Sequence, residues 1–101
     1  MDQKRRDNAD LAAGLLASLG HPTRLLIICL LIERERFGLE LLEQLGSTKG
    51  NISQHLRVLE NQGHIKSRKV ANKVYYSVAD PRLRKLVKTL QSLYCPGLGL
   101  H

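Results

Sequence analysis

The sequence is poor in several features that mark whole classes of protein. It has only two cysteines, Cys29 and Cys95, too few for a disulfide-built secreted domain and without the Cys-x-x-Cys spacing of zinc sites and thiol oxidoreductases. The longest apolar run, Leu25 to Ile32, is less than half the length that crosses a membrane. The first residues are too polar for a secretory signal. We therefore expect a cytoplasmic protein with no membrane partner.

Signatures of catalysis are missing as well. The sequence has no Gly-rich phosphate loop, no Gly-x-Ser-x-Gly nucleophile motif and no His-Glu-x-x-His motif. No two of its four histidines lie one helical turn apart, so we expect them to have structural or surface roles. The sequence predicts a protein that is not an enzyme, binds no cofactor and holds no metal.

What the sequence has in excess is positive charge, +7 overall, and this charge is unevenly distributed. Residues 1–46 hold six basic and seven acidic residues. Residues 47–79 hold six basic residues and one acidic residue, and residues 80–101 hold four and one. A basic second half indicates a polyanionic partner.

The hydrophobic periodicity predicts one domain over residues 1–101, with an ordered core over about 8–95 and a tail over 96–101. Its first part reads as four helices, separated by glycines and opened by capping residues. The second of them is apolar nearly all round and should form the buried centre. The expected helices run from an Asn8 or Asp10 cap to Gly20, from His21-Pro22-Thr23 to about Arg36, from Leu39 to Leu45, and from a Ser47 or Thr48 cap to about Gln62.

After Gly63 the period changes to two, which predicts two strands, His64–Val70 and Lys73–Val78, around an Ala71-Asn72 turn. Asp80 and Pro81 then open a last helix with leucines and a valine on one face. The expected fold is mainly α with a β-hairpin, in the order α-α-α-α-β-β-α.

The fourth helix has an apolar side, Ile52, Leu56 and Leu59, and a polar side. The polar residue types suit DNA, because amides pair with adenine, arginine pairs with guanine, and hydroxyls and free helix N–H groups bind phosphate. We predict that this helix provides seven DNA-binding residues: Thr48, Lys49, Asn51, Ser53, Gln54, His55 and Arg57.

The hairpin is basic, and we predict that Arg68, Lys69 and Lys73 bind the DNA backbone. A short helix, a tight turn, a polar helix and a basic hairpin, in that order, are typical of a winged helix-turn-helix, whose second helix enters the major groove. A non-specific nucleic-acid-binding module stays open as an alternative function.

Three segments of the sequence resemble the ArsR/SmtB family of bacterial repressors. They are Leu19 to Leu25, Gly46 to Gly63, and Val74-Tyr75-Tyr76, and the resemblance extends over about residues 11–95. It implies a homodimer joined through its first and last helices. It also implies a transcriptional repressor that stays on double-stranded operator DNA until an inducer releases it.

The metal sites of that family are not matched. The stretch Phe37 to Leu41, where thiolate-type sensors carry cysteines, has none, and Arg82 stands two residues after Asp80 where the zinc-type site has a histidine. Cys29 in the second helix and Cys95 at the end of the last helix instead resemble the cysteine pair of another branch of the family. That branch senses sulfide, persulfides or oxidants through one cysteine in each of the corresponding helices. We hypothesise that oxidation or persulfidation of this pair by a small sulfur or oxidant inducer releases the DNA. A metal or another ligand acting at a different site stays open as the alternative inducer.

Overall fold

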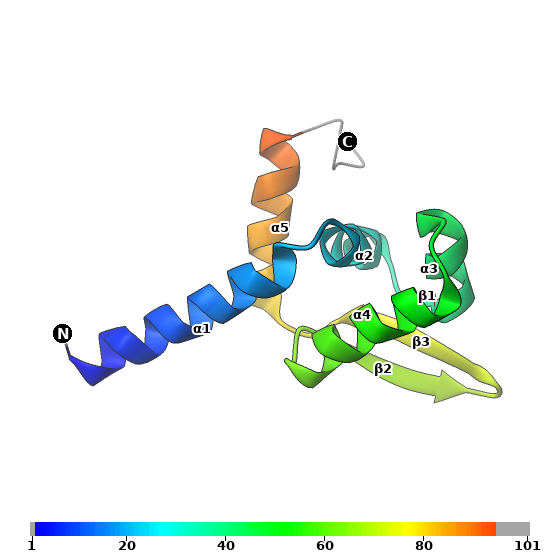
Figure 1. Cartoon of the computed structure of the whole chain (residues 1–101), viewed down its shortest axis with the longest axis horizontal. Helices are drawn as coiled ribbons and strands as arrows, with labels where there is room; N and C mark the ends of the chain where they lie inside the picture. Colours follow the sequence, from blue (N-terminus) through cyan, green and yellow to red (C-terminus); the bar gives the residue numbers. More distant parts are fainter. Residues whose placement is uncertain (1, 95–101) are drawn as a thin grey trace.

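The structure is a computed structural model and describes residues 2–94 (Figure 1). The expected order of helices and hairpin is confirmed, with one added strand. Helices α1 and α5 extend away from a body formed by α2, α3, α4 and the sheet (Figure 1). The elements are α1 (Gln3–Leu19), α2 (Pro22–Glu33), β1 (Arg36–Phe37), α3 (Gly38–Leu45), α4 (Lys49–Asn61), β2 (Ile65–Val70), β3 (Lys73–Val78) and α5 (Pro81–Leu93).

Helix α2 is the centre of the core, as its apolar sequence predicts. Ile27, Ile28 and Leu31 are at most 1% exposed, and the helix packs against α1, α3, α4, α5 and β3. Its start is set by His21, whose Nδ1 accepts a hydrogen bond from the Thr23 backbone N–H at 3.2 Å. Burying each of these aliphatic side chains contributes about 1.5–3 kcal/mol to folding, so α2 is the element on which the others are assembled.

The prediction that the second helix runs to Arg36 is wrong. The helix ends at Glu33, and Arg36–Phe37 form β1, which pairs antiparallel with β3 in a sheet of order β1-β3-β2. The Arg36 guanidinium is buried, donates to the Leu30 carbonyl oxygen at 3.0 Å and forms an ion pair with Glu33. Arg36 therefore satisfies the end of α2 while its backbone joins the sheet, which a helical period does not reveal.

The start of the first helix is also earlier than predicted. Asp2 caps it by accepting a hydrogen bond from the Arg5 backbone N–H at 2.7 Å, and Asn8 and Asp10 lie inside the helix. No proline or glycine interrupts residues 3–10, so the helix extends back to the first favourable cap. The expected capping role of Asn8 or Asp10 is therefore wrong.

The wing is the β2–β3 hairpin, residues 65–78, with pairs from Ile65↔Val78 to Val70↔Lys73. Its turn places Ala71 at φ 56°, a left-handed conformation. After it, Asp80 caps α5 as predicted, accepting from the Arg82 backbone N–H at 2.9 Å. The apolar face of α5 is only partly covered.

No single helix within residues 2–94 combines the length and the apolar character of a membrane span. Helices α1 and α2 reach those values only when they are counted together, and they meet at an angle of 96°. The apolar residues of α2 are those of the core described above.

Two histidines are built into the interior. His55 and His64 are each 8% exposed. The His55 ring lies 4.4 Å from the His21 ring, centroid to centroid, and His64 Nε2 lies 3.3 Å from the Ser18 hydroxyl, which in turn donates to the Gln62 side chain. The prediction that His55 faces DNA is wrong, because position 55 falls between the polar and apolar sides of α4 and its ring turns inward to pack on the start of α2.

The fold favours the neutral form of both buried histidines. Burial lowers the pKa of His55 and of His64 below the ordinary value of 6.5. The charges of His21 and Arg24 lower the pKa of His55 further, whereas Asp80 opposes the shift at His64. The unfolded chain therefore binds protons before the folded chain does. We expect the free energy of unfolding to have its full value above about pH 6.5. It should decrease as the pH falls toward the pKa values of His55 and His64 in the folded protein.

Urea denaturation between about pH 7.5 and 5.5 measures this effect. A His64→Gln variant keeps a polar side chain next to Ser18 but has no proton to bind, so its stability should fall less over the same range. The pKa values of Glu35, Glu40 and Asp80 lie below their ordinary values of 4.5 and 3.8, so these carboxylates stay ionised in this window. Equal pH slopes for the variant and the parent would contradict the assignment to His64.

Candidate nucleic-acid interface

Helices α3 and α4 are joined by a three-residue turn whose geometry follows from its sequence. Gly46 closes α3 with φ 67°, a left-handed conformation that glycine adopts at no steric cost. Thr48 caps α4, its Oγ1 accepting from the Asn51 backbone N–H at 3.1 Å. The Asn51 side chain also donates to Ser47 Oγ at 2.8 Å. Two of the predicted DNA-binding residues, Thr48 and Asn51, thus also hold the start of the helix.

The two sides of α4 are as predicted. Ile52, Leu56 and Leu59 are at most 4% exposed and join the core. The remaining predicted residues of this helix, with His55 excepted, form an exposed polar arc. We call this arc the α4 arc, and it consists of Lys49, Asn51, Ser53, Gln54 and Arg57. The arc combines amides, a hydroxyl and two cations, the groups that can contact both bases and phosphates.

The wing carries exposed cations on both strands. Lys66, Arg68 and Lys69 are exposed on β2, and Lys73 is exposed at the start of β3. The Lys73 ammonium lies over the Phe37 ring, 4.4 Å from its centroid. This cation–π contact holds the lysine close to β1 while leaving its charge uncompensated.

Arg68 differs from the lysines, because its charge is already paired. Its guanidinium donates to both carboxylate oxygens of Glu35, at 2.8 and 2.7 Å, and lies 5.2 Å from the centroid of the Tyr75 ring. This hydrogen-bonded pairing raises the pKa of Arg68 and lowers the pKa of Glu35, so both groups stay charged. The adjacent Ser67 donates to Glu60 of α4 at 2.6 Å, so Arg68 points to the opposite face of the sheet, away from α4. No local pattern in the sequence indicates this pair, since Glu35 and Arg68 are 33 positions apart in the chain.

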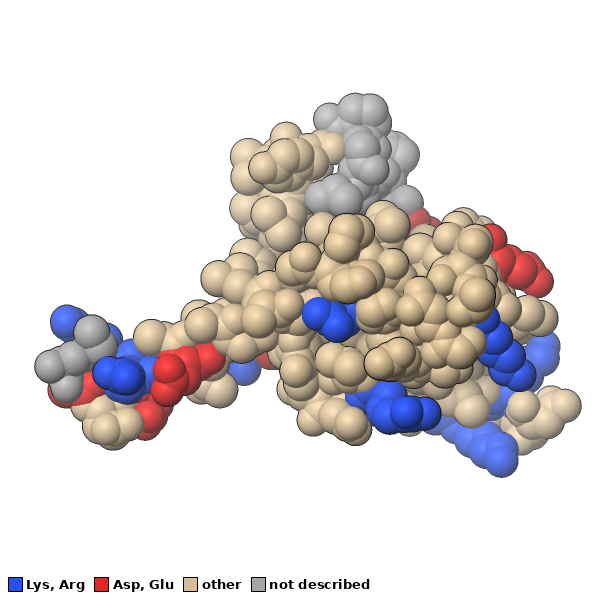
Figure 2. All heavy atoms as spheres, in the orientation of Figure 1, with Lys and Arg blue, Asp and Glu red and all other residues tan. Residues whose placement is uncertain are grey.

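Several cations of α4 and the wing have no ion pair in the part of the chain that the structure describes. Lysine and arginine side chains lie along the lower right of the space-filling view, over α4 and the wing (Figure 2). Within residues 2–94, no ion pair engages the cations of this group: Lys49, Arg57, Lys66, Lys69 and Lys73. Lys49 and Ser53 of the α4 arc line the same hollow as Asn72 and Lys73 of the wing. The structure thus places the first half of α4 and the tip of the wing side by side.

Cys29 is a buried free thiol in α2, 5% exposed. Burial raises its pKa, and a hydrogen bond with the Gln91 side chain of α5 partly offsets the increase. The predicted partner, Cys95, lies outside the described residues. Within residues 2–94, no three histidine, cysteine, aspartate or glutamate side chains gather as a metal site.

Comparisons with known proteins place the chain among bacterial regulators. Residues 21–67 match the family described as bacterial regulatory protein, arsR family. The biofilm growth-associated repressor of Xylella fastidiosa is 33% identical over 94 residues, which are 93% of this chain and 81% of that protein. The transcriptional activator HlyU of Vibrio cholerae is 31% identical over 93 residues, 92% of this chain and 86% of that protein.

Solved structures have the same fold. Reduced HlyU from Vibrio cholerae is similar with a TM-score of 0.88 and 31% identity, covering 93% of this chain and 99% of that one. The homodimeric winged helix-turn-helix DNA-binding domain of Mb0332 from Mycobacterium bovis is similar with a TM-score of 0.81, at 22% identity, over 92% of this chain and 86% of that one. The expected winged helix-turn-helix is thereby confirmed. The chain belongs to the arsR family of bacterial regulatory proteins and is a DNA-binding transcriptional regulator.

Proposed function

We propose that the protein is a sequence-specific repressor that binds operator DNA as a homodimer and is released when its two cysteines react with a persulfide or an oxidant. The observation that carries the DNA-binding part is the convergence of the α4 arc and the wing tip on one unpaired basic surface. A duplex can meet both elements at once, so α4 occupies the major groove while the wing follows the adjacent backbone.

We expect the exposed middle of α4 to contact the bases. Gln54 and Arg57 are one helical turn apart, three residues along the exposed side. Their amide and guanidinium groups can each form a bidentate contact, with adenine and guanine respectively. Lys49 at the start of the helix and the wing lysines Lys69 and Lys73 are expected to bind phosphates, which fix the register of the protein without reading sequence.

Dimerisation through α1 and α5 is supported by the apolar surface that these helices expose. Leu11 and Leu16 of α1 are 62% and 59% exposed, and Leu93 of α5 is 70% exposed. Both helices project from the body (Figure 1), where a second copy can cover them. Large apolar side chains exposed on projecting helices favour an interaction surface there. A dimer would also present two α4 helices to a DNA site with two halves.

Repression is the simplest output of such a dimer, because a protein seated on operator DNA blocks access to it. One relative is named a repressor and another an activator, so the direction of regulation in this chain is part of the proposal. A reporter gene controlled by the operator distinguishes the two directions.

The thiol part of the proposal rests on where Cys29 lies. Its side chain reaches Gln91 near the end of α5, and Cys95 follows four residues later in the sequence. The raised pKa of Cys29 makes it a poor first nucleophile, so we expect Cys95 to react first. One of the similar structures is that of HlyU in its reduced form.

The chemistry balances in two steps. The Cys95 thiolate attacks the outer sulfur of an organic persulfide, forming a Cys95 persulfide and releasing a thiolate. The Cys29 thiolate then attacks the Cys95 sulfur, forming a disulfide and releasing hydrosulfide. With a peroxide the intermediate is a sulfenic acid and water leaves instead. A bridge would tie the core helix to the interface helix and change the separation of the two α4 helices.

The readout assignment predicts two classes of DNA-binding variant. Gln54→Ala and Arg57→Ala should each cost about 1–3 kcal/mol on the operator and less on random duplex, because a base contact is lost. Lys69→Ala and Lys73→Ala should weaken binding to all duplexes and lower the salt slope by about one. The measurement is fluorescence anisotropy with an operator selected from a random library, at several salt concentrations.

An Arg6→Ala control removes one positive charge from the exposed start of α1 and should change neither quantity appreciably. If all four variants acted alike on operator and random DNA, α4 would not be the reading element. If the parent itself showed no preference for any selected sequence, the protein would be a non-specific nucleic-acid-binding module.

The thiol pair predicts a chemical switch. Treatment with glutathione persulfide should lower operator affinity at least about tenfold, within the usual range of allosteric coupling. Intact mass should show a loss of about 2 Da for a disulfide, or a gain of sulfur for a polysulfide bridge. Cys95→Ser and Cys29→Ala variants should bind DNA before treatment and keep that affinity after it.

Unchanged affinity of the treated parent, with no added sulfur and no bridge, would eliminate the thiol mechanism. Metal titration followed by mass spectrometry under native conditions then tests the alternative inducer. A bound metal that releases DNA from the Cys29→Ala variant would place the sensor elsewhere in the chain.

A further inference from the structure

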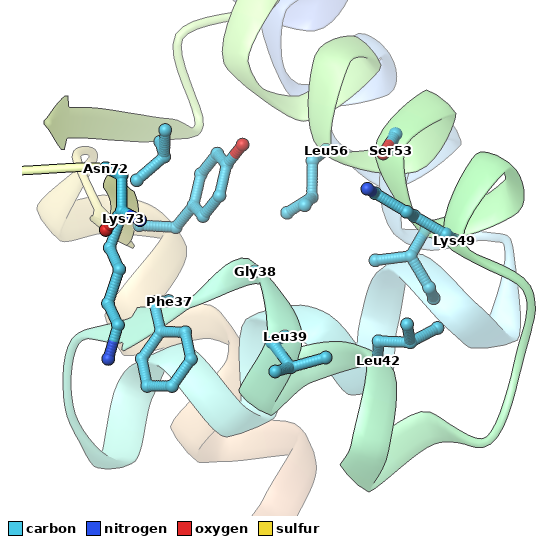
Figure 3. A pocket seen from close by; sticks show the side chains of 12 residues that line it. Phe37, Gly38, Leu39, Leu42, Lys49, Ser53, Leu56, Asn72 and Lys73 are labelled. Atoms are coloured by element: carbon cyan, nitrogen blue, oxygen red, sulfur yellow. The ribbon is translucent and has the colours of Figure 1, made fainter.

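A hollow of about 510 Å³ lies between α3, the start of α4 and the wing (Figure 3). Its walls are apolar side chains from four elements: Phe37 of β1, Leu39 and Leu42 of α3, Leu56 of α4 and Tyr76 of β3. The volume falls within the range of small-molecule sites, about 300–1,000 Å³. Leu39 is 55% exposed, so part of this apolar wall is open to solvent.

The rim of the hollow is cationic. Lys49 and Lys73 lie on opposite sides of it. The Lys49 side chain is directed toward the cavity, whereas the Lys73 ammonium is turned away from it and lies over the Phe37 ring (Figure 3). No acidic residue lines the hollow, and neither lysine has an ion pair within residues 2–94. Ser53 and Asn72 add a hydroxyl and an amide at the same rim. An apolar cavity with one positive charge directed into it, and no carboxylate among the described residues of its lining, selects for a ligand that is apolar at one end and negative at the other.

We propose that this hollow binds a small amphipathic anion, an aromatic carboxylate. The ring of such a ligand would pack on Phe37, Leu39 and Tyr76. Its carboxylate would accept charge-assisted hydrogen bonds from Lys49 and from the Ser53 hydroxyl. A cation would be repelled by the rim, and a neutral ring would leave the Lys49 charge without a partner.

DNA phosphate alone does not account for the shape of this site. Phosphate contacts need exposed cations and N–H groups and gain nothing from an aromatic floor. The hollow has both features together, and its apolar walls come from α3 and β1 as well as from the DNA-facing elements. A ligand with an apolar body would contact the apolar walls of the hollow as well as its rim.

This inference rests on the proposed function in one respect: Lys49, Ser53 and Lys73 are also proposed DNA contacts. A carboxylate bound to Lys49 would neutralise that charge and bring negative charge to the surface that faces the duplex. Ligand and DNA would therefore exclude one another. This route to release does not involve the cysteines.

The test uses 2-naphthoate as the probe and isothermal titration calorimetry without DNA. We expect saturable binding of one molecule per chain, with 2-naphthamide, the uncharged analogue, binding at least about tenfold more weakly because it cannot form the charge-assisted bonds. Lys49→Gln should weaken naphthoate binding by a similar factor. The matched control is Lys66→Gln, which removes the same charge from the wing outside the hollow and should keep the parent affinity.

Amide NMR spectra locate the site independently, with shifts expected at residues 37–42, 49–56 and 72–76. Equal affinity for the naphthamide, or shifts confined to α1 and α5, would overturn the inference. Competition is measured separately by the rise in apparent DNA Kd with naphthoate in the Cys29→Ala variant. If the parent protein bound naphthoate but showed no preference for an operator, the proposed function alone would be refuted. If it bound the operator but not naphthoate, the ligand site alone would be refuted.

Discussion

The packing of one side of α4 against the core is the contact on which the rest of the interface depends. Ile52, Leu56 and Leu59 are buried at three- and four-residue intervals, so the opposite side of the helix must face solvent. Each buried side chain contributes about 1.5–3 kcal/mol, more than an exposed ion pair supplies. The direction in which Gln54 and Arg57 point is therefore set by apolar burial, and the polar residues are free to serve recognition.

The wing is held relative to α4 by contacts on both faces of the sheet. On one face, Ser67 donates to Glu60 of α4. On the other, Arg68 binds Glu35 with both arms of its guanidinium. The pairing of β1 with β3 joins the same hairpin to the end of α2. Because these contacts order the wing before DNA arrives, less conformational entropy is lost on binding.

The parts of the site that could be predicted from sequence are those determined by local pattern. The cap of α4, predicted at Ser47 or Thr48 and found at Thr48, the Gly46 turn and the apolar stripe of α4 are signals contained within one or two helical turns. Each of these three features is confirmed. The sequence pattern predicts a DNA contact at His55, but its ring faces inward. Position 55 lies between the two sides of α4, so the direction of the ring depends on its packing against His21 at the start of α2.

The other differences also involve contacts between distant residues. Strand β1 has two residues and exists only because β3 lies beside it, so no run of alternating residues announces it. The charge of Arg68 is engaged by Glu35, 33 positions away. The local sequence pattern shows that the wing is basic. Only the structure shows a division among its cations: within residues 2–94, its arginine is paired and its lysines are not.

This division has a consequence for how the protein holds anions. Within residues 2–94, Lys49, Lys69 and Lys73 have no ion pair. A bound phosphate or carboxylate would supply the missing negative charge, so part of the affinity for any anion comes from the protein's own charge distribution.

Charge alone cannot distinguish a duplex from a small carboxylate, and other groups must do so. The uncharged Asn51 and Gln54 favour the duplex, and the apolar floor around Phe37 and Tyr76 favours the small ligand. Cys29 lies on the α5 side of the core, in contact with Gln91, and does not line that floor. Thiol chemistry would therefore reach α4 through the packing of α2, while a carboxylate would act on Lys49 directly. Both mechanisms would act on the α4 arc, but the residues that react with a persulfide or oxidant are not those that would bind a carboxylate. Either mechanism could therefore operate when the other is lost.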